Sequence, residues 1–189
     1  MHRFLFKTPN FITMNIAKER KAIDAALDNY RAQLDTIPND QFAETPPGGG
    51  WSDAEVYSHI MQATLASTVA LERCTQNSCK PTSKGINLLG RLVLFFRAFP
   101  PVRIKQPEKV AEKMPALKIS KEEARNMIIK CRQRLENVAH LIHNAENDGR
   151  IAHPRLGMLN AGQWLRFIGV HLRHHLKQLR RNENKFLKA

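Results

Sequence analysis

The chain has 189 residues, and 42% of them are hydrophobic, which is enough apolar material to bury a core without help from disulfides. Its three cysteines are an odd number, so no disulfide framework can pair all of them, and a reducing cytoplasm is the expected location. The net charge of +13 would attract anions, whether nucleic acid, a membrane surface or a small molecule, but it does not indicate a fold.

The first 14 residues are predicted to form a flexible arm. Their apolar residues are interrupted by Lys7 and Pro9, which excludes the continuous apolar core of a signal peptide. Met14 is an alternative translation start. Nothing in this segment directs the chain out of the cytoplasm.

Two helices are predicted in the first half of the chain. Apolar residues at helical spacing predict the first over residues 16–34. The turn-forming run TPPGGGW follows at 45–51. The second helix is expected from Ser52 to about Cys74, because Ser52 and Glu55 have the spacing of a capping box.

Residues 75–119 are predicted to be an irregular, basic insert. Within it, 86–99 has the composition of a short helix that Pro100 ends, and 102–119 is expected to run over the surface. The stretch 86–99 is too short, and with two arginines too charged, to span a bilayer. We therefore expect no membrane partner.

Two further helices are predicted in the last third. Ser120 and Glu123 form a second capping box, and the helix that they open is expected to reach Ile142. The loop HPRLG at 153–157 precedes a last helix that opens at Asn160, and no strand-like alternation is found. The prediction is an all-α fold, a four-helix bundle with a long crossover connection and an extra short helix, in one domain over 1–189.

Three histidines are the candidate metal ligands. His171 and His175 are four residues apart on the last helix, which places them one turn apart on one face, while His174 is off that face. His59, among apolar residues of the second helix, is the third candidate. Three imidazoles with an open position are a recurring zinc arrangement, although imidazole also suits nickel, iron and copper. Spacing alone leaves ordinary core or surface histidines as the alternative.

Two segments resemble the DinB/YfiT superfamily. GWSDAEVYSHIMQA, at 50–63, is similar to the family's second-helix signature, with a Trp, a capped start and a His seven residues after the cap. HPRLGMLNAGQWLRFIGVHLRHHLKQL, at 153–179, is similar to its last helix. The resemblance implies a divalent metal, zinc or nickel, on His59, His171 and His175. Residues 75–119 match no general pattern of the family.

Other residues near these positions have a structural and a functional interpretation. Glu55 is expected to cap its helix rather than serve the site, and Gln178 either contacts a ligand or faces solvent. Arg173 and His174 either hold an anionic substrate or lie on a solvated face. His153 is expected to fix the entry to the last helix.

The remaining candidates are expected to be structural. Trp51 and Trp164 are predicted to pack in the core or at a hinge. Cys131 lies on the apolar face of its helix, where a thiol is expected to be inert.

The resemblance implies a metal-dependent hydrolase or a transferase that uses a low-molecular-weight thiol. The expected partner is accordingly an anionic small molecule or a thiol cofactor. The alternatives are a basic nucleic-acid-binding protein and a metal-stabilised fold without catalysis. The sequence has no nucleic-acid recognition motif, so specific nucleic-acid binding is not expected. Whether a homodimer forms is left open.

Overall fold

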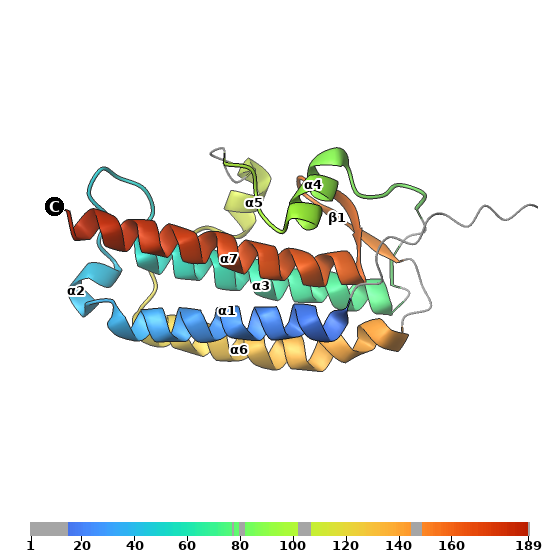
Figure 1. Ribbon diagram of the computed structural model, residues 1–189, viewed down its shortest axis with the longest axis horizontal. Helices are drawn as coiled ribbons and strands as arrows, with labels where there is room; N and C mark the ends of the chain where they lie inside the picture. Colours follow the sequence, from blue (N-terminus) through green and yellow to red (C-terminus); the bar gives the residue numbers. More distant parts are fainter. Residues whose placement is uncertain (1–14, 77, 80–81, 102–106, 145–148, 189) are drawn as a thin grey trace, which may run out of the picture.

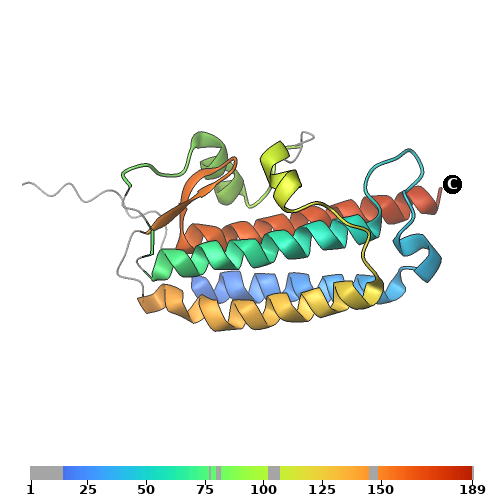
Figure 2. The same cartoon turned by 180° about the vertical axis from the view of Figure 1, so that it is seen from behind.

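Four long helices form the body of the molecule. They are α1 (Ile16–Thr36), α3 (Asp53–Thr75), α6 (Lys121–Ala139) and α7 (Ala161–Phe186). The structure is a computed structural model, and it describes residues 15–76, 78–79, 82–101, 107–144 and 149–188. Each long helix packs against two others, in the cyclic order α1, α7, α3, α6 (Figure 1, Figure 2). The predicted four-helix bundle is confirmed. The expected arm, 1–14, lies outside the described residues.

Each long helix begins at a polar residue that caps it. The cap side chain accepts a hydrogen bond from the backbone three residues later, which satisfies an otherwise unpaired N–H group. In three of the helices the residue at that position also bonds back to the cap, completing a capping box. The caps are Asn15 for α1, and the boxes are Ser52–Glu55, Ser120–Glu123 and Asn160–Gln163.

The directions of the helices explain the long connection. α1 and α7 run one way, and α3 and α6 run the other (Figure 1). Because α3 and α6 are parallel neighbours, the chain must return along the bundle between them, over the roughly 35 Å that a helix of this length spans. The predicted crossover connection is thus confirmed, and it occupies the residues between Gln76 and Ser120.

The crossover carries two short helices on the outside of the bundle, α4 (Leu88–Phe96) and α5 (Glu108–Lys113). α4 packs against α7 and is shorter than the helix predicted over 86–99. The expected surface excursion over 102–119 is largely exposed where it is described, at 107–119, although α5 was not expected. Residues 102–106 lie outside the described part.

A small hairpin corrects the expectation of no strands. β1 (Arg150–His153) pairs antiparallel with β2 (Gly157–Asn160). Gly157 has a φ of 86° and sits so close to residues 85–87 that a Cβ would meet backbone atoms at 2.8 Å. An isolated bridge from Ile86 to Gly157 attaches the start of the α4 segment to the hairpin. Strands of four residues are too short to show an alternating pattern.

Two smaller differences concern the ends of helices. A single turn, α2 (Asn39–Phe42), follows α1 where no helix was expected. α6 ends at Ala139 and continues as the 3-10 turn η1 (His140–Asn144) rather than as α-helix to Ile142. Within the described residues, no helix is long and apolar enough to cross a membrane.

Two buried tyrosines fix the helices along their axes. The Tyr57 hydroxyl donates to the Tyr30 carbonyl at 2.7 Å, and the Tyr30 hydroxyl donates to the Leu172 carbonyl at 2.8 Å. Both side chains are fully buried, and a buried hydroxyl needs such a partner. The chain of bonds links α3, α1 and α7 one residue away from His171.

Candidate metal centre

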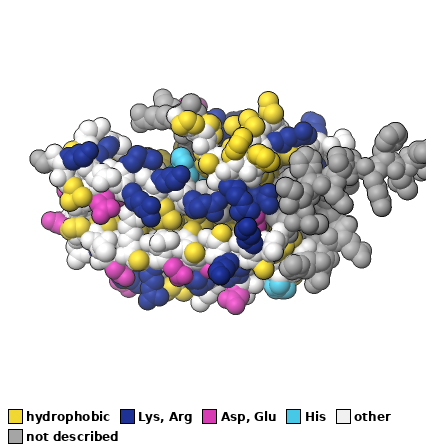
Figure 3. Space-filling model, in the orientation of Figure 1, with side chains coloured by type: hydrophobic (Ala, Val, Ile, Leu, Met, Phe, Trp, Pro, Cys, Tyr) yellow, Lys and Arg dark blue, Asp and Glu magenta, His cyan; other side chains and the backbone are white. Residues whose placement is uncertain are grey.

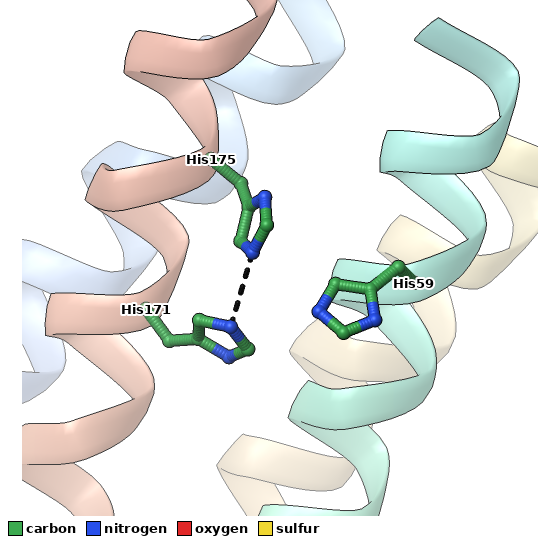
Figure 4. A group of neighbouring side chains, drawn as sticks. All are labelled: His59, His171 and His175. Carbon is green, nitrogen blue, oxygen red and sulfur yellow. Dashed lines mark hydrogen bonds between the residues drawn. The ribbon is translucent and has the colours of Figure 1, made fainter. Parts of the chain in front are cut away.

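The structure brings the three predicted histidines together. His59 comes from α3, and His171 and His175 come from α7 (Figure 4). Each offers a ring nitrogen, and these nitrogens all lie within 4.8 Å of one another. His59 and His175 are buried, and His171 is partly buried. Residues that are distant in sequence therefore share one site because α3 and α7 are antiparallel neighbours.

His171 and His175 face each other one helical turn apart. Their Nε2 atoms are separated by 3.1 Å. The Nδ1 of His175 lies 2.8 Å from the Gln178 side-chain oxygen, one turn further along α7. An amide oxygen only accepts, so Nδ1 donates and the proton of a neutral His175 sits there. Its Nε2 then carries a lone pair toward His171, as a metal ligand requires.

His59 closes the cluster from the opposite helix. Its ring lies 4.9 Å from that of His175 and 5.5 Å from that of His171, measured between ring centroids. On its other side the Trp51 ring packs at 4.9 Å. The Nδ1 of His59 is buried and has no hydrogen-bond partner among the described residues. This nitrogen lies on the side of the ring that faces away from His171 and His175, so Nε2 is the His59 atom that faces the cluster (Figure 4).

The electrostatics of the cluster favour neutral imidazoles. Burial, followed by the charge of His174, lowers the pKa of His59 to about 4. Burial is also the main cause that lowers the pKa of His171 and His175 well below the usual value, and the neighbouring histidines lower both further. At neutral pH the three rings are therefore uncharged, and uncharged imidazole is the form that binds metals.

Aromatic side chains cover the remaining sides of the cluster. Phe167 stacks on His171 at 5.2 Å, and Phe99 contacts His171 at 5.9 Å and His174 at 5.0 Å between ring centroids. Sequence reasoning missed Phe99, because it lies in the insert after α4. His153 packs against Phe167 at 4.4 Å, and its Nδ1 accepts from two backbone N–H groups of the hairpin turn.

The other candidates have mainly structural contacts. Glu55 accepts from the Ser52 backbone at 2.8 Å, so it caps α3 as expected. Cys131 is buried and donates to the Met61 carbonyl. The electrostatic neighbours of Arg173 are Arg97 and Glu19 rather than the histidines.

A separate hollow lies on the surface near the hairpin turn. None of the three clustered histidines lines it. Its lining residues are Pro107, Glu108, Lys109, Val110, Lys113, Met114 and Pro154. It therefore belongs to the α5 region and not to the histidine cluster.

Known proteins share this fold. The family model described as the DinB superfamily matches residues 22–179. YfiT from Bacillus subtilis, described as a probable metal-dependent hydrolase with an unusual four-helix bundle topology, superposes with a TM-score of 0.60 at 13% identity, over 95% of this chain and 94% of its own. TT2238, a four-helix bundle protein, gives 0.57 at 20% identity, over 88% and 99%.

A thiol-dependent enzyme is a third structural relative. A histidine-to-alanine mutant of the mycothiol-dependent maleylpyruvate isomerase gives a TM-score of 0.61 at 12% identity, over 91% of this chain and 63% of its own. At these identities the three likenesses concern the fold alone. No curated protein matches the sequence.

Proposed function

The chain belongs to the DinB superfamily, and on that premise we propose that His59, His171 and His175 hold one divalent metal ion, zinc or nickel, for a hydrolase or a thiol transferase. The observation that carries the proposal is the convergence of three neutral imidazoles from two helices. A location in the reducing cytoplasm, expected from the three free thiols, is part of this proposal.

A metal held by His59, His171 and His175 would supply Lewis-acid chemistry, which serves either to activate water for hydrolysis or to stabilise a thiolate for transfer. The side chains of the protein supply the ligands, orient them and exclude water from the cluster. Gln178 fixes the His175 ring, and Trp51, Phe99 and Phe167 cover the cluster with aromatic surface. A low-dielectric wall strengthens the interaction of the metal with an anionic ligand.

The charge beside the cluster supports an anionic substrate or a thiol cofactor. His174 packs next to His175, with ring centroids 5.0 Å apart. Lys177 and Arg181, both exposed, lower the pKa of His174 after the larger effect of burial. The chain has no Asp or Glu between residues 149 and 182. A carboxylate or thiolate that approaches along this stretch of α7 therefore meets its cations, and the nearby Glu19 carboxylate is buried and paired with Arg97 and Arg166.

The ligand set is tested by metal titration of single-site variants. We expect His59→Ala, His171→Ala and His175→Ala each to weaken zinc binding by more than about 100-fold, since losing a ligand should exceed the effect of losing a residue that supports one. His174→Ala and His153→Ala are the matched controls and should bind one zinc as the parent does. Equal losses in the controls would show that the wrong histidines are assigned.

The reaction class is tested with the cobalt-substituted protein. A small thiol that enters the open position should add an intense sulfur-to-cobalt absorption band, whereas a protein that only hydrolyses should not need such binding. Dithiothreitol and a matched alcohol are the probes. A band with the thiol but not with the alcohol, without metal-dependent cleavage of an activated ester, supports the transferase. An unchanged spectrum with the thiol, together with metal-dependent cleavage of an activated ester, supports the hydrolase. An absence of both would contradict the proposed function.

A further inference from the structure

The outer face of α4 is an exposed apolar surface. Leu88, Phe95 and Phe96 are 72%, 71% and 67% exposed, and Leu92 is 47% exposed. These four residues, called the α4 patch from here on, lie on one helix of nine residues. Figure 3 shows hydrophobic side chains protruding from the outline of the molecule over α4. Clustered exposed residues of this size mark an interaction surface, unlike single ones.

The helix that carries the patch is firmly attached to the bundle. Its inner face buries Val93 and Leu94. The Asn87 side chain caps its first turn and also donates to the Arg155 carbonyl in the hairpin turn at 2.8 Å. At the other end, Arg97 binds the buried carboxylate of Glu19 on α1. The patch therefore lies on a helix that is held in place by contacts with the bundle and the hairpin.

The chain segments that form α4, the hairpin and most of α7 contain no acidic residues, and the Glu19 carboxylate beside α4 is buried and paired with Arg97 and Arg166. No Asp or Glu occurs in residues 73–107 or in 149–182, although these stretches contain 14 of the 30 lysines and arginines. They supply α4, the hairpin and most of α7, which lie together on one side of the bundle (Figure 1). Most acidic side chains in Figure 3 lie along the opposite edge, over α1 and α6. On this side of the bundle the exposed acidic residues near the patch are Glu108 and Glu112 of α5, and cations predominate around α4 itself.

We propose that the α4 patch binds the surface of a bilayer that contains anionic lipids. Exposed Phe and Leu enter the region between headgroups and acyl chains, while flanking cations bind the headgroups, which is the pattern of an interfacial helix. Two cationic side chains near the patch are exposed: Arg91 on α4 itself and Lys84, four residues before α4 begins. The expectation of no membrane partner considered only a spanning segment, and surface binding requires none. This inference does not depend on the metal site.

Two other occupants fit less well. A second copy of the chain would bring two charges of +13 together, and like charges repel across an interface. A nucleic acid would suit the cations, and its bases could stack on Phe95 and Phe96, but it offers nothing for Leu88 and Leu92 to bury against. The convex outline of the patch suits a flat, deformable surface.

The test is co-sedimentation of the full chain with vesicles. We expect binding to vesicles of phosphatidylcholine with about one third phosphatidylglycerol, and little binding to pure phosphatidylcholine, because headgroup charge supplies part of the affinity. The double variant Phe95→Ser, Phe96→Ser should lower the partition coefficient at least tenfold, since each ring then loses its apolar contact. Arg91→Gln should lower it about fivefold.

A matched control lies on the far side of the molecule. Ile129 on α6 is 46% exposed, so Ile129→Ser should leave vesicle binding unchanged. As an independent readout, Phe95→Trp should show a blue-shifted emission that brominated lipids quench. Circular dichroism melting should show that every variant is folded, because the substituted side chains are exposed.

Three results would overturn the proposal. The first is an absence of binding to the anionic vesicles. The second is binding that the Phe95, Phe96 double variant retains in full, which would assign it to charge alone. The third is that the parent protein does not bind vesicles but instead forms a dimer in gel filtration or binds a single-stranded oligonucleotide tightly, and that the double variant loses this dimer or this binding.

Discussion

At the scale of single residues, Gln178 orients the site without being a ligand. Its oxygen accepts from His175 Nδ1 at 2.8 Å, which fixes both the ring and the position of its proton. We predict that Gln178→Leu weakens zinc affinity by about 10- to 100-fold and leaves the stoichiometry at one. Competition with a chromophoric chelator measures this. Arg180→Ala, at an exposed position two residues later, is the control. An unchanged affinity in Gln178→Leu would remove this residue from the account.

His153 should make stability depend on pH. Burial, followed by the charge of Arg155, lowers its pKa in the folded chain to about 4. The unfolded chain takes up a proton near pH 6.5, so it binds more protons than the folded chain between these values. The free energy of unfolding should therefore fall as the pH is lowered from about 6.5 to about 4, by up to about 3 kcal/mol from this residue.

The substitution His153→Asn isolates that contribution. An Asn oxygen can accept the same backbone N–H groups as His153 Nδ1 but does not titrate. Urea unfolding of the chelator-treated protein at several pH values should give a shallower decline for the variant than for the parent. Parallel curves would show that His153 is already charged, or equally shielded, in both states.

The sequence predicted the histidine cluster better than its surroundings. The i, i+4 spacing of His171 and His175 fixes their common face whatever the tertiary structure. His59 was a candidate because of its place among apolar residues of the other capped helix, and the resemblance pointed to the same residue. Phe99 could not be predicted in the same way. Its contact with His171 depends on where the crossover passes α7, and no local pattern specifies that path.

At the scale of elements, a buried ion cluster attaches α4 to the bundle. Glu19 on α1 is 2% exposed and binds Arg97, the residue that ends α4, at 3.1 Å and Arg166 of α7 at 3.0 Å. Arg97 has the left-handed backbone conformation with φ 53°, which costs about 1 kcal/mol outside glycine. The ion pair between Arg97 and Glu19 stabilises this backbone conformation at the end of α4. Phe99, two residues later, contacts His171 and His174.

We predict that Glu19→Gln lowers the free energy of unfolding by about 2–3 kcal/mol, because two partly buried arginines lose their carboxylate. Urea unfolding measures the change. Asp35→Asn removes the partner of Arg125 in a pair that is exposed on both sides, and should change stability by less than about 1 kcal/mol. Equal effects of the two substitutions would mean that the Glu19 cluster contributes no more than a surface pair.

The elements themselves were predictable to different degrees. The capping boxes at Ser52 and Ser120 placed two helix starts at the correct residues, because a cap is a local signal. The hairpin was missed, because its four-residue strands are stabilised by contacts with residues 85–87, which are distant in sequence. α5 was missed for a similar reason, since a helix of one or two turns has little periodicity to detect.

At the scale of the whole molecule, the charge is concentrated on one side of the bundle. Lys177, Arg180 and Arg181 of α7 are exposed. We predict that filter binding to duplex and single-stranded DNA is weak and sequence-blind, and that it fades between about 50 and 200 mM salt as phosphate contacts do. Sequence-dependent binding that survives the higher salt would favour a nucleic-acid function instead.

The central claim is that three histidines from α3 and α7 hold one metal ion, and its most direct test is the metal content of protein purified without a metal-affinity tag. Mass spectrometry of the element composition should find about one zinc or nickel per chain, as expected for a single three-histidine site. The double variant His171→Ala, His175→Ala, purified in the same way, should contain almost none. A parent protein that neither contains nor takes up a stoichiometric metal, or a double variant that retains it, would contradict the claim.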